Sequence, residues 1–171
     1  MLAKATHFLG VLNSWIRGFC SVVVSGLLVL IVVILFGSVF WRYFLNDPIS
    51  WSEDAALFCM VWMTLLGAPV GLMRGEHVAV DMLLNMLPGG FARTLLVAIN
   101  GVILTTAVTV VYYGGPFVRQ GMARIIPSMD WLSQGYVYLA LPVGFGLLVP
   151  VCAENILKAV RFARSGPVEL G

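Results

Sequence analysis

Ser50-Trp-Ser-Glu-Asp54 precedes a run without charged side chains from Ala55 to Met73, and the run ends at Arg74-Gly-Glu-His-Val-Ala-Val-Asp81. The uncharged run has about 19 residues, which as a helix just cross a hydrocarbon core of ~30 Å. One of its ends is acidic and aromatic, whereas the other carries charges at helical spacing. The stretch therefore predicts a membrane-spanning helix with a different polar surface on each side of the bilayer.

Composition assigns the whole chain to the membrane. Of its 171 residues, 60% are hydrophobic and 11% charged, and the mean hydropathy is +0.98. Soluble domains carry roughly 25% charged residues. A net charge of +2 without a run of Lys or Arg gives no reason to expect nucleic acid as a partner.

Three further uncharged runs are long enough to cross the bilayer as helices. The four expected spans are 18–41, 55–73, 94–118 and 131–153. No linker or internal repeat is long enough for a second domain, so residues 1–171 are expected to form one membrane domain. Only helices satisfy every backbone group in lipid without closing a barrel, and the predicted fold is an all-α four-helix bundle.

Basic residues predict the orientation of the bundle. With four spans, both termini lie on one side of the membrane together with seven of the ten Lys and Arg residues. The opposite side has only Arg42, Arg119 and Arg124, together with several acidic residues. Basic loops face the cytoplasm, so we expect a multi-pass membrane protein with both termini cytoplasmic.

The polar segment before the second span has two interpretations. Ser50 and Glu53 fit a capping box, and Asp54 adds a favourable charge to the first turn of the helix. The same segment, with Trp51 and Ser52, is also suited to dock a protein outside the membrane. Arg42, at the end of the first span, either reaches the lipid headgroups or pairs with Glu53 or Asp54.

Gly67 and Gly71 lie four residues apart on the second span. Two glycines at this spacing share one helix face and allow the backbone of another helix to come close. The pair predicts a helix contact without indicating which helix takes part.

A short interfacial helix is expected between the second and third spans, ending before Pro88. If residues 77–87 are helical, Arg74, His77 and Asp81 share one face at spacings of three and four. This stripe is either a solvated ion-paired face or a contact surface for another subunit. One histidine and one carboxylate are too few ligands for a metal site.

Several functional classes lack the residues that they require. Ion carriers keep ionisable side chains inside their spans, whereas here every such side chain falls at a span boundary or outside. The three cysteines occur singly in apolar runs, without a CxxC pair, and neither histidine lies inside a span to hold a haem. No catalytic residue, cofactor or metal is expected. By elimination the chain is an accessory membrane subunit; the alternatives are an autonomous small exporter and the membrane anchor of a redox enzyme.

Five motifs resemble the small membrane subunit (DctQ-like) of TRAP transporters, tripartite ATP-independent periplasmic transporters. They are Trp41-Arg42-Tyr43, Ile49-Ser-Trp-Ser-Glu-Asp54, Trp62 with Leu66-Gly67-Ala68, Arg74-x-x-His77-x-x-x-Asp81 and Tyr138-Leu-Ala-Leu-Pro142-Val-Gly144. The resemblance extends from Trp15 to Val160 and is most specific between Arg42 and Asp81. One departure is Asp54, where the family pattern has a second glutamate.

The resemblance implies a scaffold in a sodium-driven importer of organic acids, either C4-dicarboxylates or sialic-acid-like compounds. A periplasmic binding protein (DctP-like) would deliver the substrate, and a large permease subunit (DctM-like) would carry it. The contact candidates of this chain toward these partners and the bilayer are Arg42, Trp51, Ser52, Glu53, Asp54, Gly67, Gly71, Arg74, His77 and Asp81.

Overall fold

Four long helices dominate the computed structural model, which describes residues 2–47, 49–74 and 89–164. In chain order the elements are α1 (Leu2–Phe44), α2 (Ser52–Arg74), α4 (Gly89–Met122), β1 (Ile125–Ile126), β2 (Met129–Ser133) and α5 (Gln134–Arg164). Each helix contains a segment long and apolar enough to cross a membrane: Leu9–Phe44, Ser52–Met73, Val97–Met122 and Gln134–Leu157. The predicted all-α four-helix membrane bundle is confirmed. The expected interfacial helix over 77–87 lies outside the described residues.

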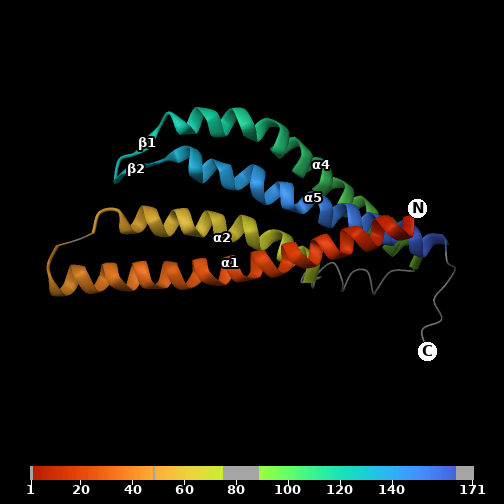
Figure 1. Cartoon of the computed structure of the whole chain (residues 1–171), viewed down its shortest axis with the longest axis horizontal. Helices are drawn as coiled ribbons and strands as arrows, with labels where there is room; N and C mark the ends of the chain where they lie inside the picture. The colour runs from red at the N-terminus through yellow and green to blue at the C-terminus, as the bar shows by residue number, and fades with distance from the viewer. Residues whose placement is uncertain (1, 48, 75–88, 165–171) are drawn as a thin grey trace.

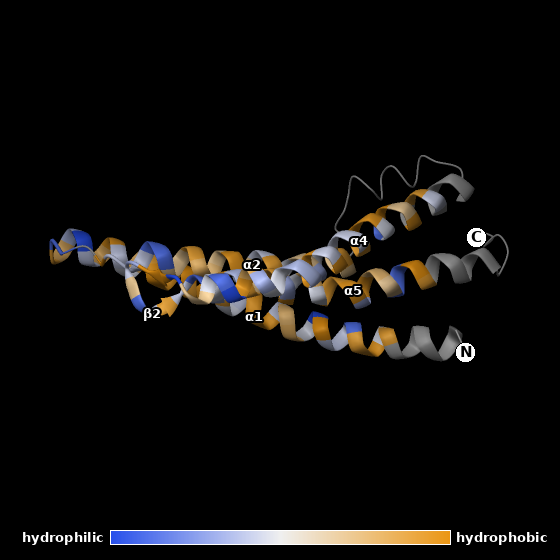
Figure 2. Cartoon of the chain, turned by 90° about the horizontal axis from the view of Figure 1, so that it is seen from above, coloured by the Kyte–Doolittle hydropathy of each residue, from blue (hydrophilic) through white to orange (hydrophobic). Residues whose placement is uncertain are grey.

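The helices lie side by side in the order α1, α2, α5, α4 (Figure 1). Seen from above, the half of the molecule that contains the α1–α2 and α4–α5 connections is much thinner than it is wide (Figure 2). Many large apolar side chains of the helices are exposed. At the opposite end α1, α4 and α5 diverge. We call the connection-bearing end, residues 42–54 and 124–133, the loop end, and the diverging end the terminal end.

α1 is longer than the predicted first span because the charged residues at either end of that span do not interrupt the helix. It ends at Phe44, where the Leu45 amide donates to the Trp41 carbonyl at 3.0 Å and Asn46 adopts a φ of 52°. Asparagine tolerates this left-handed conformation better than other residues with a side chain, which suits it to end a helix.

Ser52, rather than Ser50, provides the serine contacts at the start of α2. The first helical bond joins the Ala55 amide to the Trp51 carbonyl at 3.0 Å, so the capping position belongs to Trp51 and the predicted capping box at Ser50 is wrong. The Ser52 hydroxyl donates to the Ile49 carbonyl at 2.8 Å and lies 2.8 Å from the Ser38 hydroxyl of α1. Ser52 is only 1% exposed, and this contact ties the two helices together.

A small hairpin, which the hydropathy pattern does not predict, joins α4 to α5. β1 pairs with β2 in antiparallel orientation, with Ile126 opposite Met129. Trp131, predicted to begin the last span, lies on β2 instead, because α5 begins only at Gln134. Met129 turns inward and is buried.

Small residues make up much of the interior. Cys20, Cys59 and Cys152 are free and buried. α5 meets its neighbours through glycines: a Cβ atom built at Gly144 would lie 2.8 Å from the Leu65 carbonyl oxygen of α2, and one at Gly135 would lie 2.7 Å from the Met122 amide nitrogen. Side chains there would clash with backbone, so these helices approach more closely than larger residues allow.

Candidate functional site

The loop end combines an ion pair with exposed aromatic side chains. Arg42 lies 3.5 Å from Glu53, and both side chains are more than half exposed. Of the two interpretations of Arg42, the structure therefore shows pairing with Glu53. An ion pair this exposed contributes little to stability, which leaves both side chains available to a partner.

Asp54 has an internal role. Its carboxylate accepts a hydrogen bond from the hydroxyl of Ser128, in the turn between β1 and β2. The side chain is half-buried, so it fastens the hairpin to the start of α2. Asp54 and the buried Ser52 therefore stabilise the loop end, whereas Arg42 and Glu53 remain on its surface.

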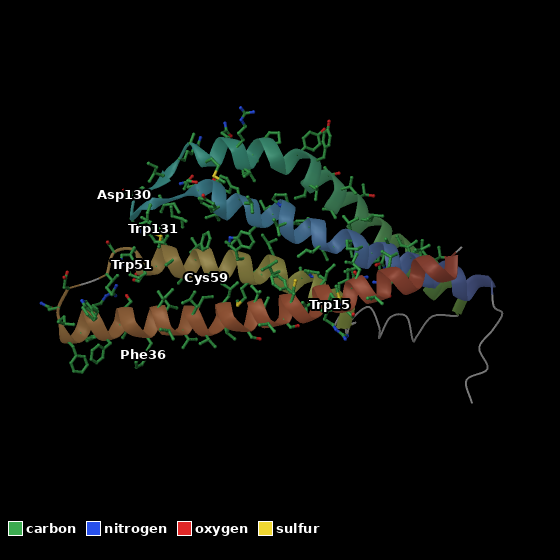
Figure 3. All side chains as sticks on the ribbon, viewed as in Figure 1. Trp15, Phe36, Trp51, Cys59, Asp130 and Trp131 are labelled. Carbon is green, nitrogen blue, oxygen red and sulfur yellow. The ribbon has the colours of Figure 1, made fainter. Side chains whose placement is uncertain are left out.

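Two tryptophans from distant parts of the sequence lie at the loop end. Trp51 lies before α2 and Trp131 on β2, and they are 44% and 77% exposed. Figure 3 shows both at this end of the molecule, with Asp130 beside Trp131. Asp130 and Trp131 were missed as site candidates because they were assigned to the boundary of the last span. The turn residues Pro127 and Ser128, with a charge directly before Trp131, were the available signal.

One face of α2 has no neighbour among the described residues. Met60, Thr64, Gly67 and Gly71 follow one another at spacings of four, three and four, and no atom lies within 4 Å of a Cβ built at either glycine. The predicted close helix contact at Gly67 and Gly71 is therefore not made with a helix that the structure describes. We call these four residues the open face of α2.

Another face of α2 borders an apolar cavity of about 700 Å³ between α1, α2 and α5. Phe58, Trp62 and Leu66 line it from α2, and the Trp62 indole nitrogen donates to the Tyr136 carbonyl at 3.2 Å. Arg74 is the last residue of α2, but its side chain is not described, and His77 and Asp81 lie outside the described residues.

The terminal end holds a buried polar cluster that the sequence did not reveal. Glu154 is only 8% exposed and accepts a hydrogen bond from the Asn13 amide of α1. The same amide reaches the Pro150 carbonyl at 3.3 Å, while Asn155 donates to Asn100 of α4 at 3.3 Å. Glu154 lies three residues before the end of the apolar stretch Gln134–Leu157, so its position agrees with the expectation that ionisable side chains lie at a span boundary or outside.

The arrangement of these groups suits the binding of other proteins. Within the described residues no three His, Cys, Asp or Glu side chains come together as a metal site. The loop end offers charges and indole rings to a water-exposed partner, and the open face of α2 offers close backbone approach to another helix.

One known protein family matches most of the chain. The family model for the DctQ component of tripartite ATP-independent periplasmic transporters matches residues 31–162. This range includes both loop-end segments, the open face of α2 and Glu154, but not Asn13.

Curated relatives carry matching names. The chain is 27% identical over 139 residues to the C4-dicarboxylate TRAP transporter small permease protein DctQ of Vibrio cholerae, covering 68% of this chain and 60% of that one. It is 22% identical over 153 residues to the sialic acid small permease protein SiaQ of the same organism, covering 90% and 88%. The isethionate permease protein DctMQ of Oleidesulfovibrio alaskensis is 26% identical over 155 residues, and the match spans 86% of this chain but only 24% of the relative.

Proposed function

The chain belongs to the DctQ component family of TRAP transporters, and we propose that it is the membrane scaffold of such a transporter, bracing a large permease subunit (DctM-like). The family match over residues 31–162 carries this proposal. The family is a transporter component and not an enzyme. Together with the four apolar helices, membership of this family identifies the chain as a multi-pass protein of the inner membrane.

The transport reaction that we propose is sodium-driven import of an organic acid. Relatives are named for C4-dicarboxylate, sialic acid and isethionate, which are all organic anions. Among the residues whose side-chain burial the structure describes, Glu154 is the one buried acidic or basic residue, and it accepts a hydrogen bond from Asn13. Substrate and sodium are therefore assigned to the large subunit.

The two surfaces of the chain suit two kinds of partner. The open face of α2 lies along a span, where glycines and a threonine favour helix packing within lipid, so it is assigned to the large subunit. The loop end, with Arg42, Glu53, Trp51 and Trp131, is assigned to the periplasmic binding protein (DctP-like). This assignment requires the terminal end to be cytoplasmic, in agreement with the excess of basic residues there.

Uptake into proteoliposomes tests the scaffold assignment. The three subunits are reconstituted in every combination under an inward sodium gradient, with labelled C4-dicarboxylate and sialic acid as substrates. We expect sustained uptake only when this chain, the large subunit and the binding protein are all present. Uptake or efflux by this chain alone would instead identify it as an autonomous transporter.

A matched pair of tryptophan variants tests the docking surface. Trp131→Ala and Trp15→Ala each remove an indole that is 77% exposed, the first at the loop end and the second on α1 toward the terminal end (Figure 3). Trp131→Ala and Glu53→Lys should raise the binding-protein concentration needed for half-maximal uptake, because rim contacts act on association. The saturated rate should change less, and Trp15→Ala should leave both values unchanged. Equal effects of the two tryptophan variants would contradict docking at the loop end.

Cysteine labelling tests the orientation. Asp130→Cys at the loop end and Gly90→Cys near the start of α4 are introduced separately, while the three native cysteines are buried and give little background. In intact cells a membrane-impermeant maleimide should label Cys at 130 and not at 90. The reverse pattern would place the loop end in the cytoplasm.

A further inference from the structure

The apolar cavity between α1, α2 and α5 has a volume of about 700 Å³, and every residue that lines it is apolar. Ligand pockets in proteins usually measure roughly 300–1,000 Å³, so this cavity has room for a bound molecule. Among the lining residues, Cys20 is fully buried, whereas Trp15 and Phe19 are 77% and 68% exposed. The cavity therefore extends from the interior of the helix bundle to its outer surface.

The length of the cavity corresponds to one leaflet of a bilayer. Its lining on α1 runs from Trp15 to Leu27, a distance of about 18 Å at a rise of 1.5 Å per residue. Half of a hydrocarbon core is about 15 Å thick. Trp15 lies toward the terminal end (Figure 3), just before the uncharged run that begins at Gly18, and Val143 lies near the middle of the span Gln134–Leu157. The cavity therefore runs from the terminal-end surface of the membrane to its middle.

The cavity lies on the side of α2 opposite the open face. Trp62 lines the cavity, and it is two residues away from both Met60 and Thr64 of the open face. Successive residues of an α-helix are about 100° apart, so Trp62 lies about 160° around the helix from each of them. A large subunit on the open face leaves this side of α2 to the lipid. The choice of a lipid as occupant rests on that proposed assignment of the open face.

Charge favours an anionic lipid. Arg17 lies in the turn of α1 between Trp15 and Phe19, and its side chain is exposed. Just before the uncharged run, a long cationic side chain reaches the level of the headgroups. Seven of the ten Lys and Arg residues fall on this side of the predicted topology. Because a guanidinium binds a phosphate through two parallel hydrogen bonds, Arg17 suits a phosphate at the outer end of the cavity.

We propose that this cavity binds one acyl chain of an anionic phospholipid, phosphatidylglycerol, with the lipid phosphate at Arg17. Lipid chains surround the protein in any case, so the hydrophobic effect does not select the occupant. An empty cavity would lack dispersion contacts along its whole lining, and a chain that lies along α1 restores them. The phosphate contact then distinguishes one lipid class from another.

Native mass spectrometry of the purified full chain tests the proposal. The delipidated chain in detergent is titrated with phosphatidylglycerol and with phosphatidylcholine of identical acyl chains, and bound lipid is counted. We expect one molecule of phosphatidylglycerol to bind saturably. It should bind about fivefold more tightly than phosphatidylcholine, the size expected for one arginine near an anionic group.

Two pairs of neighbouring residues locate the acyl chain. Val23 and Leu27 line the cavity, whereas Val22 and Leu28 are exposed and do not. Val23→Trp and Leu27→Trp each place an indole in the cavity and should abolish saturable binding of both lipids. Val22→Trp and Leu28→Trp introduce the same side chain on the same helix and should bind as the wild type does.

Arginine variants locate the headgroup. Arg17→Gln should remove the preference for phosphatidylglycerol and leave the affinity for phosphatidylcholine unchanged. Arg119→Gln, which removes an exposed cation near the end of α4, is the control and should keep the preference.

The lipid should also stay bound when the large subunit is added. Release on assembly would overturn the proposal, because it would place the large subunit on the cavity. The absence of saturable binding by the wild type, equal affinity for the two lipids, or wild-type binding by both Val23→Trp and Leu27→Trp would overturn it as well. Failure of the reconstituted transporter to take up substrate while the lipid stays bound would contradict the proposed function and support the lipid site.

Discussion

The hairpin of α4 and α5 packs through glycine, whereas the hairpin of α1 and α2 does not. Cβ atoms built at Gly121 and Gly135 would collide with the facing helix, and one at Gly114 would lie 3.3 Å from the Pro142 side chain. In α1 and α2, five glycines have no atom within 4 Å of such a Cβ, namely Gly18, Gly26, Gly37, Gly67 and Gly71. Among the glycines that the structure describes, those of the α4–α5 pair include several that contact the facing helix of the same pair, whereas Gly101 and Gly115 of α4 are as open as the five glycines of α1 and α2.

The α1–α2 pair is instead held by other contacts. Cys20 of α1 packs with Leu66 and Val70 of α2, and Ser38 contacts Ser52 at 2.8 Å near the loop end. Much of α1 remains exposed, and Phe36 points away from the other helices (Figure 3). Glycines in a span therefore indicate where close approach is possible, and the unused ones indicate where a partner from outside the chain fits.

The largest effect is expected from Gly135→Ala. The added Cβ would lie 2.7 Å from the backbone nitrogen of Met122, which cannot move aside as a side-chain tip can. Overpacking of this kind costs about 1–3 kcal/mol, and the midpoint of thermal unfolding in detergent should fall by several degrees. Gly101→Ala in α4 is the control, because no atom lies within 4 Å of a Cβ built at Gly101. This variant should keep or raise the midpoint. Equal midpoints for Gly135→Ala and Gly101→Ala would show that α4 and α5 pack less closely at Gly135 than described.

The next effect concerns assembly rather than folding. Gly67→Leu and Gly71→Leu should change the free energy of unfolding of the isolated chain by no more than about 0.5 kcal/mol, because nothing lies near a Cβ built at either glycine. Both should lower the amount of large subunit that co-purifies, since leucine separates the two backbones. Gly26→Leu, an equally open position on α1, is the matched control. Normal co-purification of both α2 variants would mean that the open face contacts lipid.

A smaller effect on stability should distinguish the two serines of the loop end, Ser52 and Ser50. Ser52→Ala removes the hydrogen bonds to the Ile49 carbonyl and to Ser38 and should cost about 1 kcal/mol of stability. Ser50 is exposed and does not cap α2, so Ser50→Ala should lower the stability by less than about 0.5 kcal/mol, as a neutral surface substitution does. Denaturation of the two variants side by side measures the difference. A larger loss for Ser50→Ala would restore the capping box.

The smallest effect is expected from Arg42→Gln. This variant breaks the ion pair with Glu53, whose side chains are 57% and 79% exposed, and surface pairs of this kind contribute about 0–1 kcal/mol. The midpoint should hardly change, while the salt dependence of uptake at limiting binding protein should become weaker. Asp54→Asn is the comparison, because it weakens the bond to Ser128 and should lower the midpoint more. A stability loss confined to Arg42→Gln would make the ion pair structural.

Hydropathy and charge, read from the sequence alone, determined the membrane class and the four helices, and the resemblance of five motifs indicated the family. These properties depend on local composition, because the absence of charge over about 20 residues is sufficient to identify a span. The same local reasoning failed at Trp131, because β2 continues to Ser133 through the first residues of the span that hydropathy predicts.

The tertiary structure alone decided which polar and small residues meet. Asp54 contacts Ser128 and Asn13 contacts Glu154 across 74 and 141 positions of sequence. Whether Gly67 or Gly144 receives a neighbour depends on the rotation and axial shift of each helix relative to the next. An uncharged run specifies neither quantity, since every face of such a helix is equally soluble in lipid, and only the packing of complete side chains distinguishes them.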